Sequence, residues 1–383
     1  MKLDDELREK TPSNEEIALK QISEYNDARK SISDYAVGKA LMDDGSIELI
    51  KHDFISTKTV SMWYACAGLG KSTFVYQEAM LLAQNQSAFG LEPTQPVKSL
   101  IFQWEDTDKK IWKLVNGIQR EYGWTTETME SIRDLVIIPS KKLLVGKSMM
   151  EVLSIIESAV RLDKPHIVWL NPITAFFDGN ISSAQEVTIL RKEIDRIAET
   201  YNVHFALIHH IGKQMKNTKD GKRFTELDMY DGIGSSIFPN WCRSMIAMHP
   251  TNATLQSDPD KQLYCLSITK NQYELGWRDK DDKRTSVRYM SYGDPNICWI
   301  DHGFDAVSPK EIKEEKIDVD KSSMIVRLKM GKDKAISITQ LCEQFGRSRD
   351  WVKDRLNEIK SEAPLISYPE GKSNMYYIET EVF

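Results

Sequence analysis

Residues 65–73 hold the side chains whose types and spacing point most directly to chemistry. The run Ala-Cys-Ala-Gly-Leu-Gly-Lys-Ser-Thr meets the pattern G-x-x-x-x-G-K-[ST] at Gly70, Lys71 and Ser72, with Ala65 in place of the first glycine. In such a loop the backbone N–H groups and the positive end of the following helix bind phosphates. The lysine reaches the β- and γ-phosphates and the hydroxyl ligates Mg²⁺, so the run predicts an ATP–Mg²⁺ site. The residues expected to contact the nucleotide are Ala67, Gly68, Leu69, Gly70, Lys71, Ser72 and Thr73.

Two interpretations of this loop stay open at the level of sequence. Alanine at position 65 permits a short turn, but it adopts a positive φ only with strain. The alternative to a phosphate loop is an ordinary helix N-terminus that carries Gly-Lys-Ser. Cys66 is interpreted either as a reactive thiol or as a small packed residue.

A second apolar run ends in the acidic pair Glu105 and Asp106. The carboxyl end of a parallel strand lies in the crevice where α/β sheets bind ligands. A carboxylate placed there can orient and deprotonate the water that attacks a γ-phosphate. The alternative is that the acids only cap the next helix.

Two further runs end in polar residues that suit the same site. The run 166–172 has the form of a Walker B strand, but its tip is Asn171 rather than a carboxylate. An amide can accept a hydrogen bond from metal-bound water but adds no charge, so weaker Mg²⁺ affinity is expected unless Asp178 substitutes. The next run ends in His209 and His210, which point to opposite faces of a strand. One of them is expected to face the nucleotide as a sensor, and a core histidine is the alternative.

The elements that must position these residues alternate along residues 55–300. Apolar runs predict strands at 60–64, 99–104, 135–138, 166–170 and 204–208, and helical patterns fill 71–83, 109–122, 148–162 and 184–201. This alternation predicts an α/β fold with a mainly parallel sheet. The later runs 243–248, 263–269 and 287–290 predict an antiparallel continuation of that sheet.

The composition is that of a globular protein rather than a basic or membrane one. The 383 residues are 41% hydrophobic and 28% charged, with a net charge of -6, which argues against an overall basic coat for nucleic acid. No apolar run reaches about 18 residues, and the first ten residues alternate in charge, so neither a membrane span nor a secretory signal is expected. Five scattered cysteines without a C-x-x-C pair support neither zinc nor disulfides, and a cytoplasmic location is expected.

Four parts are expected along the chain. Residues 1–50 form a helical extension, since Ser13 and Glu16 resemble a capping box; it either packs on the core or reaches a neighbouring subunit. Residues 51–305 form the ATPase domain, and the charged, proline-interrupted stretch 306–322 is a linker. Residues 323–383 read as two helices and a hairpin, which predicts a winged helix.

The last part carries a local positive charge within an acidic protein. Residues 321–360 contain ten Lys/Arg against five Asp/Glu. In a winged helix the second helix enters the major groove and the wing touches phosphates, although such modules also dock proteins. The expected DNA contacts are Arg347, Arg349, Lys353, Arg355 and Lys372. The basic segment 213–223 is either a pore loop that grips single-stranded DNA or a solvated loop.

The ordered set of motifs over about residues 50–300 resembles the RepA-like hexameric replicative helicases of plasmids and phages, which have a RecA-like ATPase core. Besides the four strand ends, the segments 234–243 and 268–273 carry the resemblance. It implies that Lys71 and Ser72 bind phosphate and Mg²⁺. It also implies that Glu105 is the catalytic base, with Asp106 beside it toward the metal, and that His210 senses the γ-phosphate.

The resemblance further implies a site shared between subunits. Arg243 matches the arginine finger that such rings insert into the neighbouring subunit's site, with Lys270 nearby. The chain departs from the pattern at Ala65 and Asn171, which bears on the rate of hydrolysis more than on nucleotide binding.

The function expected from the sequence is therefore an ATP-dependent DNA helicase or translocase that replicates a mobile element. Its expected partners are single-stranded and duplex DNA, five further copies in a homo-hexamer, and a replication initiator or primase. The alternative is an ATP-gated DNA-binding regulator or recombination mediator with slow or no hydrolysis. A structural adaptor with a degenerate ATPase fold is the third hypothesis.

Overall fold

The structure is a computed structural model, and it describes residues 13–33, 44–177, 181, 183–211, 227–230, 237–270, 275–279, 281–293, 297–307, 321–371 and 373–379. Several predicted features lie outside these residues, namely Asp178, the basic segment 213–223, residues 234–236 and 271–273, most of the linker, and Lys372. Within the described part of the chain, no helix is both long and apolar enough to cross a membrane.

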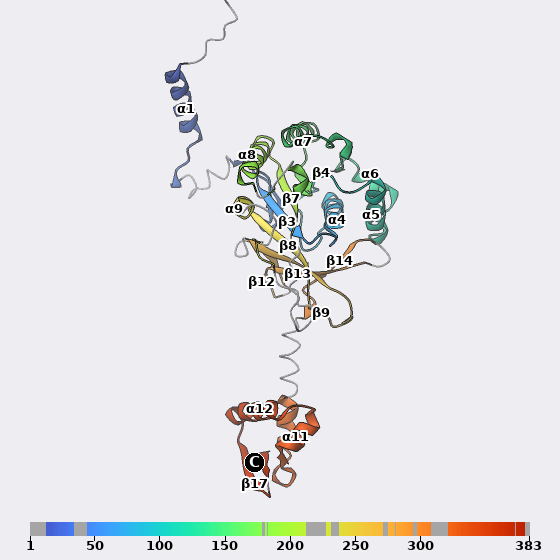
Figure 1. The fold of residues 1–383 in the computed structure, drawn as a ribbon, viewed down its shortest axis with the longest axis vertical. Coiled ribbons are helices and arrows are strands. Elements are labelled where there is room, and N and C mark those ends of the chain that lie inside the picture. The colour runs from blue at the N-terminus through green and yellow to red at the C-terminus, as the bar shows by residue number, and fades with distance from the viewer. Residues whose placement is uncertain are drawn as a thin grey trace, which may run out of the picture.

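A nine-stranded sheet forms the centre of residues 44–307, in the order β14-β13-β10-β8-β3-β7-β6-β4-β5 (Figure 1). Its strands are β3 (Val60–Ala65), β4 (Ser99–Gln103), β5 (Val136–Ile137), β6 (Ile167–Asn171), β7 (His204–His210), β8 (Ser244–Pro250), β10 (Tyr264–Lys270), β13 (Val287–Tyr292) and β14 (Trp299–Gly303). The strands from β8 to β5 in this order run parallel to one another. Strands β10, β13 and β14 each run antiparallel to their neighbours in the sheet. The predicted α/β fold with a mainly parallel sheet is confirmed.

Strand β8 differs from its prediction as part of an antiparallel continuation. It runs parallel to β3, with Ser244 opposite Ser61, and the antiparallel part begins only at β10. The chain enters β8 from the short helix α9 (Ile237–Trp241) at the same end at which β3 begins, so β7 and β8 are joined by a crossover rather than by a hairpin. An apolar run alone does not indicate whether a strand runs parallel or antiparallel to its neighbour.

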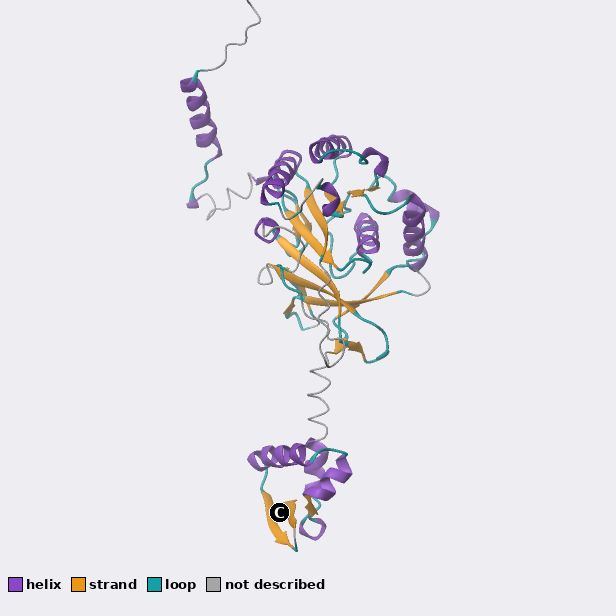
Figure 2. Ribbon diagram, viewed as in Figure 1, coloured by secondary structure: helices purple, strands orange, loops and turns teal. Residues whose placement is uncertain are grey.

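Helices cover both faces of the sheet (Figure 2). One face packs α4 (Lys71–Ala83), α5 (Asp108–Glu121) and the neighbourhood of α6 (Thr126–Ser131); the other packs α7 (Met149–Asp163), α8 (Ala184–Tyr201) and α9. Successive residues of β3 enter the two cores in turn, Trp63 on the first side and Tyr64 on the second. Strands β3, β4 and β6 are buried at every position, as strands covered on both faces must be.

Short strand pairs extend the domain past its expected limits. They are β1 (Glu48–Ile50) with β2 (Ile55–Ser56), β9 (Thr254–Leu255) with β15 (Ala306–Val307), and β11 (Trp277–Arg278) with β12 (Arg284–Thr285). Leu49 and Ile50 are buried in the core, so this domain begins before residue 51. The single-turn helices η1 (Lys141–Leu143) and η2 (Ile173–Phe176) complete it.

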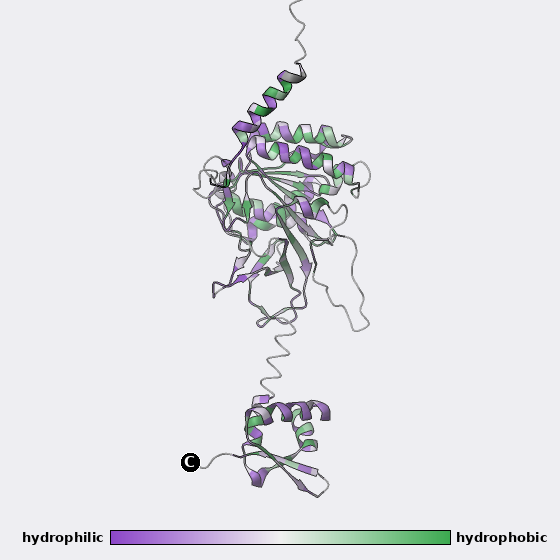
Figure 3. Ribbon diagram, turned by 90° about the vertical axis from the view of Figure 1, so that its left-hand side faces the viewer, coloured by the Kyte–Doolittle hydropathy of each residue, from purple (hydrophilic) through white to green (hydrophobic). Residues whose placement is uncertain are grey.

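Two further parts flank the domain. Helix α1 (Asn14–Ala28) begins at the predicted capping box, in which Ser13 and Glu16 bond each other's backbone N–H. Residues 321–379 form a helix over 321–328, followed by η3 (Lys332–Lys334), β16 (Ile336–Ser337), α11 (Ile338–Phe345), α12 (Arg349–Glu362), β17 (Leu365–Glu370) and β18 (Ser373–Ile378). These elements enclose a small apolar core of their own. Figure 3 shows apolar and hydrophilic residues interspersed along them.

Candidate nucleotide site

The loop between β3 and α4 has the geometry of an anion site, and Ala65 does not strain it. Gly68 and Gly70 take the positive φ values, 77° and 95°, that the turns need. Ala65 is the last residue of β3; it is fully buried, lies opposite His210 and Met248, and is not among the residues with positive φ. Position 65 needs no positive φ, because the turns begin after it, so alanine is accommodated there without strain.

Lys71 lies at the centre of this loop. Its Nζ donates to the backbone carbonyls of Ala65 and Cys66, at 3.0 and 2.9 Å, and the residue is only 8% exposed. Burial lowers the pKa of Lys71 to about 8, although the nearby Glu105 carboxylate opposes the shift. A phosphate would replace the two carbonyls as the partner of this ammonium.

Two predicted residues from separate strand ends meet beside the loop. His210 Nε2 lies 3.4 Å from Glu105 Oε1, at the carboxyl ends of β7 and β4. Burial and, next, the charge of Lys71 lower the pKa of His210, so this ring is neutral near pH 7 and can accept or donate one hydrogen bond. His209 points to the other face, where its ring lies 5.7 Å from that of Phe238. The two histidines therefore lie on opposite faces of β7, and of the two only His210 lines the cavity beside the loop.

Asn171 also reaches the loop. Its Nδ2 donates to Ser72 Oγ at 3.2 Å, and the residue is 4% exposed. A hydroxyl beside an amide suits Mg²⁺, which takes oxygen ligands and keeps several waters. The described residues contain no group of three or more His, Cys, Asp or Glu side chains that could hold a metal. Ser72 and Asn171 thus fit an ion held mainly by the phosphates of a nucleotide.

These residues line one cavity of about 300 Å³. Helix α5 contributes Lys110, Lys113 and Leu114 to its wall, the antiparallel strand β13 contributes Tyr292, and the connection before β14 contributes Ile297. The two lysines follow Glu105 by five and eight residues, and this closeness to Glu105 in the sequence is a signal by which they could have been predicted as lining residues. The lining residues are Gly68, Gly70, Lys71, Ser72, Thr73, Glu105, Lys110, Lys113, Leu114, Asn171, His210, Tyr292 and Ile297.

Asp106 is not among the lining residues. It is 2% exposed, and its backbone N–H and C=O bond the side chain of Gln103 at 2.7 and 2.8 Å. Its carboxylate forms an ion pair with Lys110 on α5. The cap of α5 is Thr107, so neither acid of the pair is the helix cap. Asp106 therefore holds the turn after β4, and its expected place near the metal is not what the structure shows.

An aromatic pair from the antiparallel strands holds the loop from outside. The Tyr292 hydroxyl donates to the carbonyl of Leu69, and Trp299 Nε1 donates to that of Gly70 at 3.2 Å. The two rings stack with centroids 3.9 Å apart, and Trp299 is 1% exposed. Gln77 of α4 bonds both the backbone N–H and C=O of Trp299, each at 2.7 Å. Sequence reasoning missed these residues, which lie far along the chain from the loop.

Arg243 and Lys270 lie away from this cavity. Arg243 precedes β8 and donates its backbone N–H to Val60, at the start of β3, whereas the loop follows the end of β3. Lys270 Nζ donates to the carbonyls of Pro239 and Cys242, the latter at 2.6 Å. Burial lowers the pKa of Lys270, and the charge of Arg243 adds to that effect. The two cations lie at the end of the sheet where β3 and β8 begin, and the loop follows the other end of β3. Neither cation therefore reaches the nucleotide site of its own chain.

The predicted DNA contacts in α12 and just before it divide between two sides of this helix. Lys353 lines a cavity of about 350 Å³ with Asn357, Lys360 and Ser367, between α12 and the hairpin β17–β18. Arg347 and Arg355 instead lie over the ring of Trp351, at 5.3 and 5.7 Å. Arg355 is also paired with Glu358 at 2.7 Å and is 17% exposed. Arg349 is exposed at the start of α12.

Comparison with known proteins bears on the first part of the chain. The AAA_25 family model, which describes an AAA domain, matches residues 44–216. A search of curated proteins found no significant match. The matched span contains the loop, Glu105, Asn171 and His210, so this part of the chain is similar to an AAA domain, which is of the P-loop ATPase type. The aromatic pair and the edge with Arg243 lie beyond it.

Proposed function

We propose that this protein is an ATP-driven DNA motor, a helicase or translocase that works as a ring, with each ATP cleaved between two subunits. The observation that carries the proposal is the meeting of Glu105 and His210 beside Lys71 in one cavity. A carboxylate with a neutral imidazole beside a phosphate loop can hold a water and take its proton.

The residues of one chain supply most of such a reaction. Lys71 and the loop N–H groups would stabilise the triphosphate, and Glu105, with a side chain 57% exposed, could accept the proton of the attacking water. Mg²⁺, when bound, would neutralise charge on the β- and γ-phosphates, with Ser72 and Asn171 as its neighbours.

What one chain does not bring to the cavity is an arginine. The described lining residues include three lysines and no arginine. Arg243 stands exposed on the opposite edge of the sheet, where it could enter the cavity of an adjacent copy. An arginine supplied by a neighbour stabilises the charge of phosphoryl transfer, and this supports a ring rather than a single chain.

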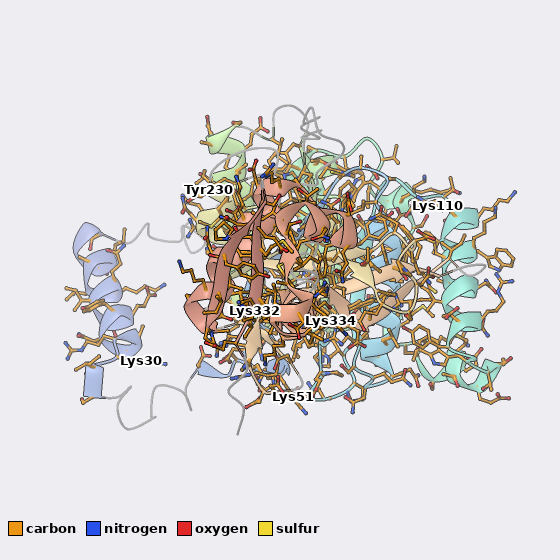
Figure 4. The ribbon with its side chains drawn as sticks, turned by 90° about the horizontal axis from the view of Figure 1, so that it is seen from below. Lys30, Lys51, Lys110, Tyr230, Lys332 and Lys334 are labelled. Carbon is orange, nitrogen blue, oxygen red and sulfur yellow. The ribbon has the colours of Figure 1, made fainter. Side chains whose placement is uncertain are left out.

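The C-terminal part supports DNA as the partner. Its order of helices, hairpin and short third strand suits a winged helix, with α12 as the recognition helix and β17–β18 as the wing. Lys353 and Lys360 lie on the side of α12 that borders the hairpin cavity, and Arg349 is exposed at the start of the helix. Lys332 and Lys334 of η3, which lies against the hairpin, add to the positive charge of this part (Figure 4). We propose that this side of α12 faces DNA.

The test is DNA-stimulated ATP turnover of the full chain, with Glu105→Gln as the variant. The amide keeps the shape of the side chain but cannot accept the proton, so turnover should fall about 100-fold or more while nucleotide binding persists. Forked DNA with a 5′ or a 3′ tail then reports unwinding and its direction. Turnover that survives this change would remove Glu105 as the base.

A mixing experiment tests the shared site. Arg243→Ala and Glu105→Gln should each be inactive alone. In mixed rings some interfaces pair an intact Glu105 with an intact Arg243 from the neighbour, so part of the turnover should return. If mixing restores nothing although both variants bind nucleotide and assemble, Arg243 does not act across an interface.

A second candidate is an ATP-gated DNA-binding regulator, and Asn171 is the observation that favours it. An amide in place of a carboxylate beside Ser72 adds no charge to hold Mg²⁺. This candidate predicts nucleotide-dependent assembly on DNA without stimulated turnover.

A further inference from the structure

The stacked pair Tyr292 and Trp299 touches the phosphate loop but does not belong to it. Each ring donates one hydrogen bond to a loop carbonyl, Tyr292 to Leu69 and Trp299 to Gly70. The rings leave no room between themselves and the loop, since a Cβ on Gly70 would lie 1.7 Å from the Tyr292 hydroxyl oxygen. The packing is therefore close enough to fix the path of the loop at this glycine.

A trans peptide unit joins the carbonyl of one residue to the N–H of the following residue, and these two groups point in opposite directions. Drawing the carbonyl of Leu69 outward turns the N–H of Gly70 inward. The carbonyl of Gly70 accepts both the Trp299 bond and the first helical bond of α4, from Phe74 N–H at 3.0 Å, so Trp299 adds to a direction that the helix already gives the N–H of Lys71. Inward N–H groups attract phosphate, whereas a carbonyl turned inward would repel it. Glycine at position 70, with φ of 95°, resists such a flip less than other residues do, so an external hold matters there.

We infer that Tyr292 and Trp299 are positioning residues of the nucleotide site, which keep the N–H groups of Gly70 and Lys71 directed at the phosphates. The pair is itself rigid. Trp299 is fixed to α4 through both bonds to Gln77, and Tyr264 packs edge-on against both rings, at 5.6 and 5.2 Å. The phosphate loop of the matched AAA domain is thus completed by two strands from outside the match.

This inference rests on the proposed nucleotide site, and the test separates the two. Dissociation constants of the full chain are measured for ATP and for inorganic triphosphate, both with Mg²⁺, in wild type, Lys71→Ala, Tyr292→Phe and Tyr264→Phe. Tyr292→Phe removes one hydroxyl and should weaken both ligands by a similar factor, about 3- to 10-fold. Tyr264→Phe removes a hydroxyl from the third ring of the same cluster and should leave both constants unchanged.

Further readouts distinguish positioning from general stability. The unfolding temperature without nucleotide should change by no more than a few degrees in Tyr292→Phe, since one hydrogen bond is lost. Trp299→Phe, which keeps a ring but removes the N–H, should weaken both ligands in the same way. Equal affinities of wild type and Tyr292→Phe would overturn the inference. Weaker binding of ATP with unchanged binding of triphosphate would overturn it as well, because it would assign the hydroxyl to the base or sugar. Failure of the wild type to bind either ligand would instead remove the nucleotide site itself.

Discussion

At the residue scale, the chemistry of the site depends on the protonation state of its buried groups. Lys71 has the carbonyls of Ala65 and Cys66 as partners and little water, so its ammonium is easier to deprotonate than a surface lysine. His210 is likewise kept neutral by burial and by this ammonium. Bringing a triphosphate to the loop adds negative charge beside Lys71, which favours its protonated form. Proton binding to Lys71 and phosphate binding should therefore support each other.

From this coupling we predict how nucleotide affinity changes with pH. The pKa of Lys71 is about 8 in the free site, so the lysine is mostly charged below pH 8 and mostly neutral above it. Affinity for ATP should fall as the pH rises through 8, by up to about tenfold per pH unit beyond it. Titration calorimetry between pH 7 and 9.5 measures this slope. Lys71→Met should bind more weakly and without that slope, and a flat wild-type profile would contradict the prediction.

At the scale of elements, the pattern of the sequence was sufficient for the helices and strands of the parallel part. Strand β3 and helix α8 are predicted because continuous apolar runs mark buried strands and helical periodicity marks amphipathic helices. Helix α4 is buried along nearly its whole length, and its place directly after the phosphate loop is what predicts it. The loop itself was recognisable from three residues in a row. The direction of β8 was not predictable, because the direction of a strand depends on the crossover before it rather than on its side chains.

The outer wall of the site was also out of reach of the sequence. Tyr292 and Leu69 are 223 residues apart in the chain, and nothing in the local pattern of β13 marks a tyrosine that bonds the loop. The same limit applies to Arg243 and Lys270, which were named for the site by resemblance and lie on the opposite edge of their own sheet. Local patterns fix elements, whereas interactions between distant elements follow from the packing.

The junction of β3 and β7 contains a buried titratable group whose effect on stability can be measured. His204 is fully buried and bonds Ser61 Oγ at 2.8 Å and Thr59 Oγ1 at 2.9 Å. Burial lowers its pKa to about 3, against an ordinary value near 6.5. Between these values the unfolded chain binds the proton and the folded chain does not.

Stability should therefore fall as the pH drops from 6.5 toward 3, by up to about 1.4 kcal/mol per pH unit from this group. Above pH 6.5 His204 is neutral in both states and contributes no slope. Denaturant unfolding at pH 7, 6, 5 and 4 measures the effect. His204→Gln, which cannot titrate, should show a shallower acid slope even if it is less stable at pH 7; an unchanged slope would assign the acid sensitivity to other groups.

At the scale of the whole molecule, the proposed motor needs a domain that binds DNA, and the two sides of α12 separate the candidates. Lys353 and Lys360 border the hairpin cavity, whereas Arg355 forms an ion pair with Glu358 and lies over the ring of Trp351.

We predict that Lys353→Ala combined with Lys360→Ala weakens binding of the full chain to duplex DNA. The salt dependence of binding should also fall, by about one unit of log–log slope for each phosphate that is no longer neutralised. Arg355→Ala, which removes a positive charge from the other side, is the control, to be compared with Lys353→Ala alone, and should change neither. Binding is measured by fluorescence anisotropy from about 50 to about 300 mM salt. If Arg355→Ala weakens DNA binding and the double variant does not, the side of Trp351 faces DNA instead; if neither matters, α12 serves a protein partner and the motor binds DNA through other residues.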